Sequence, residues 1–90
     1  MKFLVSWSLP QGTYRSAVAR FLKAGGMPPA GVKLIGRWHG MSGAGCAVVE
    51  TNDAKALYAW FAEWSEFLPV QTTPVLEDAD AGAVLESMYK

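Results

Sequence analysis

The chain has 90 residues, about half of them hydrophobic, and its eight basic and eight acidic side chains cancel at neutral pH. A balanced charge gives no long-range field that would attract a polyanion, so neither nucleic acid nor an anionic membrane is an expected partner. No stretch approaches the roughly 20 apolar residues of a membrane span. Two serines interrupt residues 1–9 and Pro10 ends this stretch, so we expect no signal peptide. The lone Cys46 allows no internal disulfide. These features predict a single domain over residues 1–90 in the cytoplasm.

Two elements are predicted in the first third of the chain. Residues 2–8 alternate between apolar and polar side chains, which is typical of a strand, and Pro10 and Gly12 end it. From about Thr13, apolar side chains recur at helical spacing until Gly25-Gly26, so this segment is predicted to be a helix.

A hairpin is predicted in the middle of the chain. The loop 27–31 contains two prolines, which forbid a helix, and it leads into a predicted strand over 32–39. The glycine-rich segment 40–45 then connects this strand to another over 46–51. Those glycines lack the lysine of a phosphate-binding loop and precede no helix, so they indicate a turn and no nucleotide cofactor.

Three elements are predicted in the last third. Asn52 or Asp53 can cap a helix whose apolar stripe is Leu57, Trp60, Phe61, Trp64 and Leu68. Residues 70–76 are extended but contain Pro74, which removes a ladder donor and favours the edge of a sheet. Residues 78–90 form a final predicted helix with an apolar stripe of Ala81, Val84, Leu85 and Met88. Gly82 weakens this helix, so we expect it to need a surface to dock against.

The order of these elements, βαββαβα, predicts an α+β fold of the ferredoxin-like, split βαβ type with an added C-terminal helix. In that topology the four strands, numbered along the chain, form an antiparallel sheet in the order 4-1-3-2, which places the proline-containing strand at the edge as required. The first two helices cover one face of the sheet. The other face is left for solvent, a partner or a ligand.

The segment Gly36 to Gly40 gathers an arginine, a tryptophan and the only histidine, and it is the best candidate for a site. In strand 32–39 the alternating set that includes Val32, Leu34 and Trp38 is the better core set. We therefore expect Arg37 and His39 on the opposite, open face. Glu50 joins them there only if the hairpin register allows it, and would then pair with Arg37.

Each candidate side chain also has an ordinary structural interpretation. His39 can act as a general base or simply satisfy a backbone carbonyl, and Arg37 can bind a carboxylate or guard a sheet edge. Trp7 and Trp38 can form the walls of a ligand site, although indoles facing helices more often belong to the core. Cys46 is more typical of a small buried thiol than of a nucleophile, and one histidine with scattered carboxylates predicts no metal site.

The chain resembles the family named domain of unknown function 3303. The resemblance rests on the segments Lys2 to Ser8, Val32 to His39, Val49 to Asp53 with Leu57-Tyr58 and Glu63-Trp64, and Pro74 to Asp78, and it covers nearly the whole chain. The family implies a fold like that of the dimeric α+β barrel proteins, in which two ferredoxin-like sheets stack face to face. It has no established activity, so no catalytic residue is transferred from it.

Three functional hypotheses follow. The first is a cytosolic homodimer that holds a small organic molecule without catalysis, either between stacked sheets or between sheet and helices. In that hypothesis Arg37, His39 and Glu50 provide polar contacts, and Trp7 and Trp38 provide walls. The second is a cofactor-independent oxygenase or isomerase with His39 as the base. The third is a protein-interaction module in which the sheet face or the last helix docks another protein.

Overall fold

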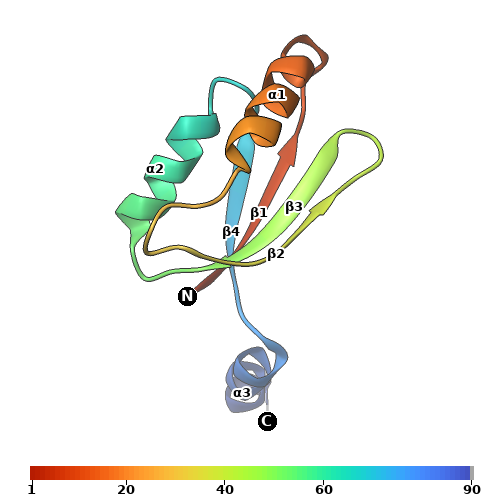
Figure 1. Cartoon of the computed structure of the whole chain (residues 1–90). Coiled ribbons are helices and arrows are strands. Elements are labelled where there is room, and N and C mark those ends of the chain that lie inside the picture. Colours follow the sequence, from red (N-terminus) through yellow and green to blue (C-terminus); the bar gives the residue numbers. More distant parts are fainter. Residues whose placement is uncertain (90) are drawn as a thin grey trace.

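The computed structural model describes residues 1–89 (Figure 1). The predicted elements are all present, with a short turn of 3-10 helix at Gln11–Thr13 before the first helix. The strands are β1 (Lys2–Ser8), β2 (Lys33–His39), β3 (Ala44–Glu50) and β4 (Val70–Val75), and the helices are α1 (Tyr14–Ala24), α2 (Ala54–Trp64) and α3 (Asp78–Tyr89). Residue 90, the end of the last predicted helix, lies outside the described residues.

The four strands form one antiparallel sheet in the order β2-β3-β1-β4, which confirms the predicted order and the ferredoxin-like α+β fold. β4 lies at the edge, as its proline required: Pro74 stands opposite Phe3 of β1. Helices α1 and α2 lie over the same face of the sheet (Figure 1). We call this the covered face and the other the open face.

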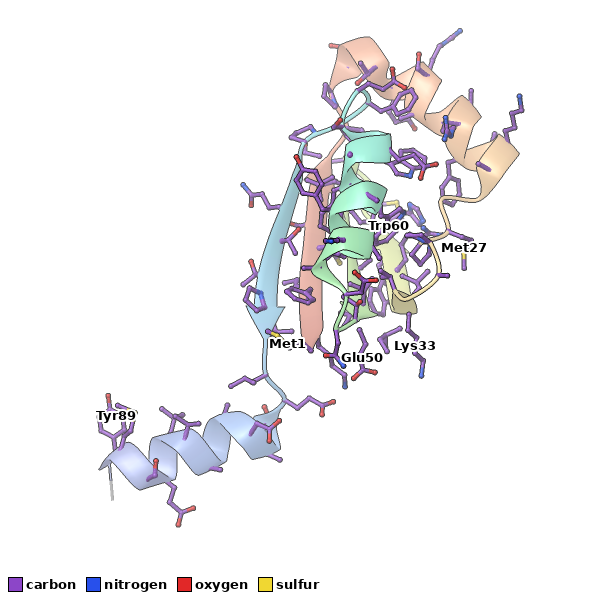
Figure 2. All side chains as sticks on the ribbon, turned by 90° about the vertical axis from the view of Figure 1, so that its left-hand side faces the viewer. Met1, Met27, Lys33, Glu50, Trp60 and Tyr89 are labelled. Atoms are coloured by element: carbon purple, nitrogen blue, oxygen red, sulfur yellow. The ribbon has the colours of Figure 1, made fainter. Side chains whose placement is uncertain are left out.

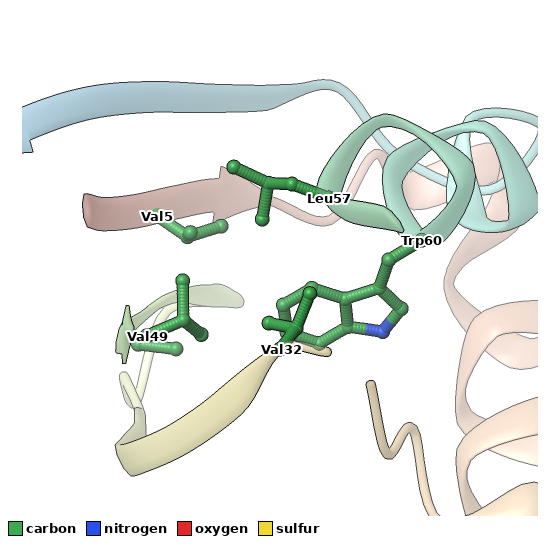
Figure 3. Packing of buried hydrophobic residues seen from close by; sticks show 6 residues of the cluster. Val5, Val32, Val49, Leu57 and Trp60 are labelled. Carbon is green, nitrogen blue, oxygen red and sulfur yellow. The ribbon is translucent and has the colours of Figure 1, made fainter. Parts of the chain in front are cut away.

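The core lies between α2 and the covered face. In the β1–β3 register, Val5 stands opposite Ala47 and Phe3 opposite Val49, so these side chains share the covered face. Val5, Ala47 and Val49 are almost completely buried. Leu57 and Trp60 of α2 pack onto them (Figure 3), which confirms that the apolar stripe of this helix faces the core.

Strand β2 contains an irregularity that overturns one prediction. Its register against β3 shifts between Leu34 and Gly36: Leu34 stands opposite Val49, whereas Gly36 stands opposite the neighbouring Val48. Ile35 is therefore an extra residue, a β-bulge, and every side chain beyond it changes face.

Beyond the bulge, Arg37 stands opposite Ala47 and His39 opposite Gly45, so both lie on the covered face. Trp38 stands opposite Cys46 on the open face and is 58% exposed. The prediction that Trp38 belongs to the core while Arg37 and His39 face outward was wrong, because it assumed an uninterrupted period of two along β2.

Two polar side chains fix the start of α2. Thr51 is buried, and its hydroxyl donates to the Gly31 carbonyl (2.7 Å) and accepts from the Asp53 amide (2.9 Å). Asp53 then caps the helix by accepting from the Ala56 amide at 3.1 Å. Of the two predicted caps Asp53 is therefore the one used, while the Asn52 side chain accepts a hydrogen bond from the N-terminal amine.

Helix α3 extends away from the rest of the molecule (Figures 1 and 2). None of its residues is buried. The radius of gyration is 15.3 Å, whereas a compact domain of this length has about 12 Å. The surface that α3 was expected to need is therefore not supplied by the body of its own chain.

An ion pair lies immediately before helix α3. Lys2 Nζ donates to Glu77 Oε1 at 2.5 Å. This hydrogen bond lowers the pKa of Glu77 below its ordinary value and raises that of Lys2. Because the pKa of Glu77 is depressed in the folded state, the contribution of the pair is complete above the unfolded value of about 4.3 and is lost as the pH falls through the lower, folded value.

In Lys2→Met we expect the pKa of Glu77 to rise towards its ordinary value, because its hydrogen-bond donor is gone. An NMR titration of the Glu77 carboxyl carbon measures this shift. Lys33→Met is the matched control, since Lys33 lies on β2 at the far edge of the sheet. An unchanged pKa of Glu77 in Lys2→Met would contradict the ion pair.

Candidate functional site

A pocket of about 330 Å³ opens between α1, α2 and the covered face of the sheet. This volume is at the lower end of the range of small-molecule sites, roughly 300–1,000 Å³. Its walls are mainly apolar and come from β1, both helices and β4, including Trp7, Phe21, Trp60, Phe61, Trp64 and Val70. The polar groups Arg37 and His39 line it where the β2–β3 hairpin begins.

Small residues leave room for the pocket wall on the sheet side. The indole of Trp7 lies across Gly45, where a Cβ atom would come within 2.5 Å of the ring. A side chain at this position would displace Trp7. The glycine that was predicted only as part of the turn thus also lets Trp7 lie along the wall of the pocket.

Arg37 connects the sheet to the end of α1. Its guanidinium donates from Nη1 to the Gly26 carbonyl (2.7 Å) and from Nη2 to the Gly25 carbonyl (3.1 Å), and it lies 5.0 Å from the centroid of the Phe21 ring. These carbonyls are exposed in this direction because both glycines adopt positive φ angles and end the helix. The negative end of the helix dipole favours a cation there.

The Arg37 guanidinium also keeps donors for a second partner. It has five N–H groups, and the two carbonyls use two of them. Partial burial lowers its pKa, but an arginine remains charged at any physiological pH. A carboxylate in the pocket would find both a positive charge and unused donors.

His39, the last residue of β2, lies against aromatic rings. Its imidazole meets Phe21 at 5.4 Å and Trp7 at 6.3 Å between ring centroids, both edge-on. Within residues 1–89, neither a hydrogen bond from this ring to a backbone carbonyl nor a carboxylate that orients the ring is found. The hydrogen bond to a backbone carbonyl that was considered as a structural role for His39 is therefore not observed in this described part of the chain.

Trp60 contributes a polar atom that the sequence did not single out. The residue is only 6% exposed and lines the pocket. Its indole nitrogen is buried and is the one side-chain donor in the described part of the chain that is buried without an acceptor. Figure 3 shows this nitrogen turned away from Val5 and Val49. A buried N–H without a partner costs about 1–3 kcal/mol.

The predicted site residues separate into two groups. Arg37, His39 and Trp7 come together in the pocket. Trp38 and Glu50 lie on the open face, where Glu50 stands opposite Lys2 on one side and Lys33 on the other. The conditional Arg37–Glu50 pair is therefore not formed.

Cys46 has no base beside it in the part of the chain that the structure describes. This half-buried residue stands opposite Trp38 on the open face, whereas His39 lies on the covered face. Among the residues described, no three His, Cys, Asp or Glu side chains gather closely enough to hold a metal ion. Within residues 1–89, no helix combines the length and apolar character that crossing a membrane would take.

Sequence alone did not find the roles of Phe21 and Trp60, because both fall on ordinary apolar helical stripes. The sequence feature that could have indicated a pocket was the combination of large aromatic residues with small residues in the elements around it. Ala17 on α1 and Ala44 at the start of β3 line the pocket, and Gly45 makes room for the ring of Trp7.

These features define a ferredoxin-like α+β protein with an aromatic pocket beneath its helices and a cation at one side of it. The chain belongs to the family described as Domain of unknown function (DUF3303), whose model matches residues 1–89. This match confirms the family resemblance noted from the sequence. No curated protein matches the chain.

Proposed function

We propose that this protein binds a small organic molecule in the pocket between its helices and its sheet, without catalysis, and acts as a cytoplasmic homodimer. The observation that carries the proposal is the pocket itself, an apolar space of about 330 Å³ with Arg37 at its side. Sites for small molecules typically combine apolar walls with a few placed polar groups. We favour the cytoplasm, a reducing compartment, because the single cysteine is unpaired.

The ligand class follows from the walls. Trp7, Phe21 and Trp60 offer aromatic surfaces suited to a flat, largely apolar molecule. The unused N–H groups of Arg37 are donors only. We therefore infer a planar ligand with a carboxylate or another anionic, oxygen-bearing group.

Binding is better supported than proton transfer at His39. A general base is usually oriented by a hydrogen-bonded partner, and Glu50, the carboxylate considered as a candidate beside Arg37 and His39, lies on the other face of the sheet. The edge-on contacts of His39 with Phe21 and Trp7 fit a wall of the site.

The proposal can be tested with two probes that share aromatic rings but differ in charge, anilinonaphthalene sulfonate and the neutral N-phenylnaphthylamine. We expect both to bind at one site per chain, detected by fluorescence titration of the full-length protein. Arg37→Met is expected to weaken the sulfonate about tenfold, because charge-assisted hydrogen bonds are lost, and to leave the neutral probe nearly unchanged.

Trp38→Leu is the control, since Trp38 lies on the open face and should affect neither probe. Circular dichroism establishes that each variant is folded before titration. Native mass spectrometry of gently purified protein adds an independent test, in which we expect a dimer that carries a reproducible extra mass. Absence of probe binding to the folded wild type, or equal weakening of both probes in Trp38→Leu, would overturn the proposed pocket.

A further inference from the structure

Two apolar surfaces of the chain have no partner in the described structure. The first, the α3 stripe, consists of the positions predicted to dock, Ala81, Val84, Leu85 and Met88. Val84, Leu85 and Met88 are between 50% and 67% exposed. The second is the middle of the open face, formed by Leu4, Val48, Cys46 and Trp38, which the register brings together on neighbouring strands.

The open face offers a flat apolar platform. Trp38 lies over Gly36, where a Cβ atom would come within 2.7 Å of its ring, so the indole extends along β2 instead of standing away from it. Gly36 stands opposite Val48, which stands opposite Leu4. A helix laid on this face would cover aromatic and aliphatic surface together.

We infer that α3 of one copy of this chain lies on the open face of a second copy, and that the exchange is mutual. This inference rests on the homodimer of the proposed function but not on its pocket, which lies on the other side of the sheet. It also differs from direct stacking of two sheets, because a helix takes the place that the second sheet would occupy.

Charge complementarity favours a second copy as the occupant. Residues 77–90 contain four acidic side chains, Glu77, Asp78, Asp80 and Glu86, and one basic side chain, Lys90, a net charge of −3. Residues 1–76 contain seven basic and four acidic side chains, a net charge of +3. Lys33 lies on the open-face side of the sheet, whereas Lys2, on the other side of Glu50, is already paired with Glu77 of its own chain. An acidic arm is therefore attracted to the body of another copy.

A mutual exchange lowers the area that each surface has to supply. A stable interface buries roughly 1,200–2,000 Å² in total. A twofold exchange uses four surfaces, two stripes and two open faces, so each needs to contribute only about 300–500 Å². Each copy supplies one α3 helix and one open face, so a dimer pairs every helix with a face and needs no other protein.

The extended position of the arm is the geometry that exchange requires. Only Leu76 and Glu77 separate β4 from α3. With so short a connection, and with Glu77 held by Lys2, the helix projects beyond the end of the sheet (Figure 2). A projecting helix can reach a neighbouring molecule, whereas covering its own open face would require the chain to reverse within these residues.

The first experiment adds the same charge to opposite sides of α3. Leu85→Glu places a carboxylate in the stripe, whereas Ala83→Glu places it about 200° around the helix. Both positions are exposed in the single chain, so neither change disturbs the body. By analytical ultracentrifugation of the full-length protein we expect Leu85→Glu to weaken the dimer at least tenfold and Ala83→Glu to leave it close to wild type. A dimer that Leu85→Glu does not weaken would overturn the inference.

The second experiment uses the natural Cys46 on the open face as a reporter. In Met88→Cys, oxidation is expected to join the thiol introduced on α3 of one chain to Cys46 of another, detected by mass spectrometry after mixing ¹⁴N- and ¹⁵N-labelled protein. Ala83→Cys is the control and should not form this link. A link within one chain only would show that the helix folds back on its own sheet, and a monomer without the link would remove the dimer altogether. Either result overturns the inference, while probe binding still tests the pocket independently.

Discussion

Trp60→Ala is expected to lower the free energy of unfolding by about 3–5 kcal/mol, the usual cost of removing a buried tryptophan. A domain of this length has a total stability of roughly 5–13 kcal/mol, so this change would remove a large part of it. The indole joins the core of Val5 and Val49 to the pocket wall, and its removal would extend the pocket into the core. Urea denaturation followed by circular dichroism measures the effect.

Tyr58→Ala is the matched control for Trp60→Ala. Tyr58 lies on the same helix but is 76% exposed, and we expect its replacement to change stability by less than about 0.5 kcal/mol. If both variants were equally stable, α2 would not pack on the sheet through the face described above.

Arg37→Met is expected to lower the free energy of unfolding by about 2–3 kcal/mol. The substitution keeps most of the apolar length of the side chain but removes two charge-assisted hydrogen bonds to Gly25 and Gly26 and the contact with Phe21. We place the effect below the sum of the two bonds because the guanidinium is only half-buried. Hydrogen exchange should show the loss most clearly in the amides of α1, since Arg37 ties the end of this helix to the sheet.

Arg37→Lys separates charge from geometry. A single ammonium can approach one carbonyl but cannot bridge two as the planar guanidinium does, so an intermediate stability is expected. Arg15→Met, at an exposed position on α1, is the control and should leave stability almost unchanged. Unaltered exchange of α1 amides in Arg37→Met would contradict the proposed connection.

The fold followed from sequence patterns wherever those patterns reflect local physics. Pro74 predicted an edge strand because it lacks a ladder donor, and β4 lies at the edge. The stripe from Leu57 to Leu68 predicted the buried face of α2 for the same kind of reason. The bulge in β2 escaped prediction because the alternation there was taken as continuous, although a lone glycine within a strand, here Gly36, is a known indication of a bulge.

The candidate site was predictable only in part. Arg37 and His39 were identified by their chemistry, since they are the cation and the only imidazole in one short segment. The face of the sheet on which they lie was not predicted correctly, because it depends on the register beyond Ile35. The aromatic walls were hidden for another reason: a side chain lining an unfilled space between a helix and a sheet has the same spacing as one in a filled core.

The bulge at Ile35 also bears on how such a site is gained or lost in evolution. If Ile35 were instead paired in a regular ladder opposite Val48, Arg37 and His39 would turn outwards and Trp38 inwards, whereas deletion of Ile35 would leave all three on their present faces. Loss of the bulge without any change of length would therefore exchange the cation of the pocket for an indole. Among related sequences, the residues that favour the bulge, Ile35 and the adjacent Gly36, are therefore as informative about the pocket as the residues that line it.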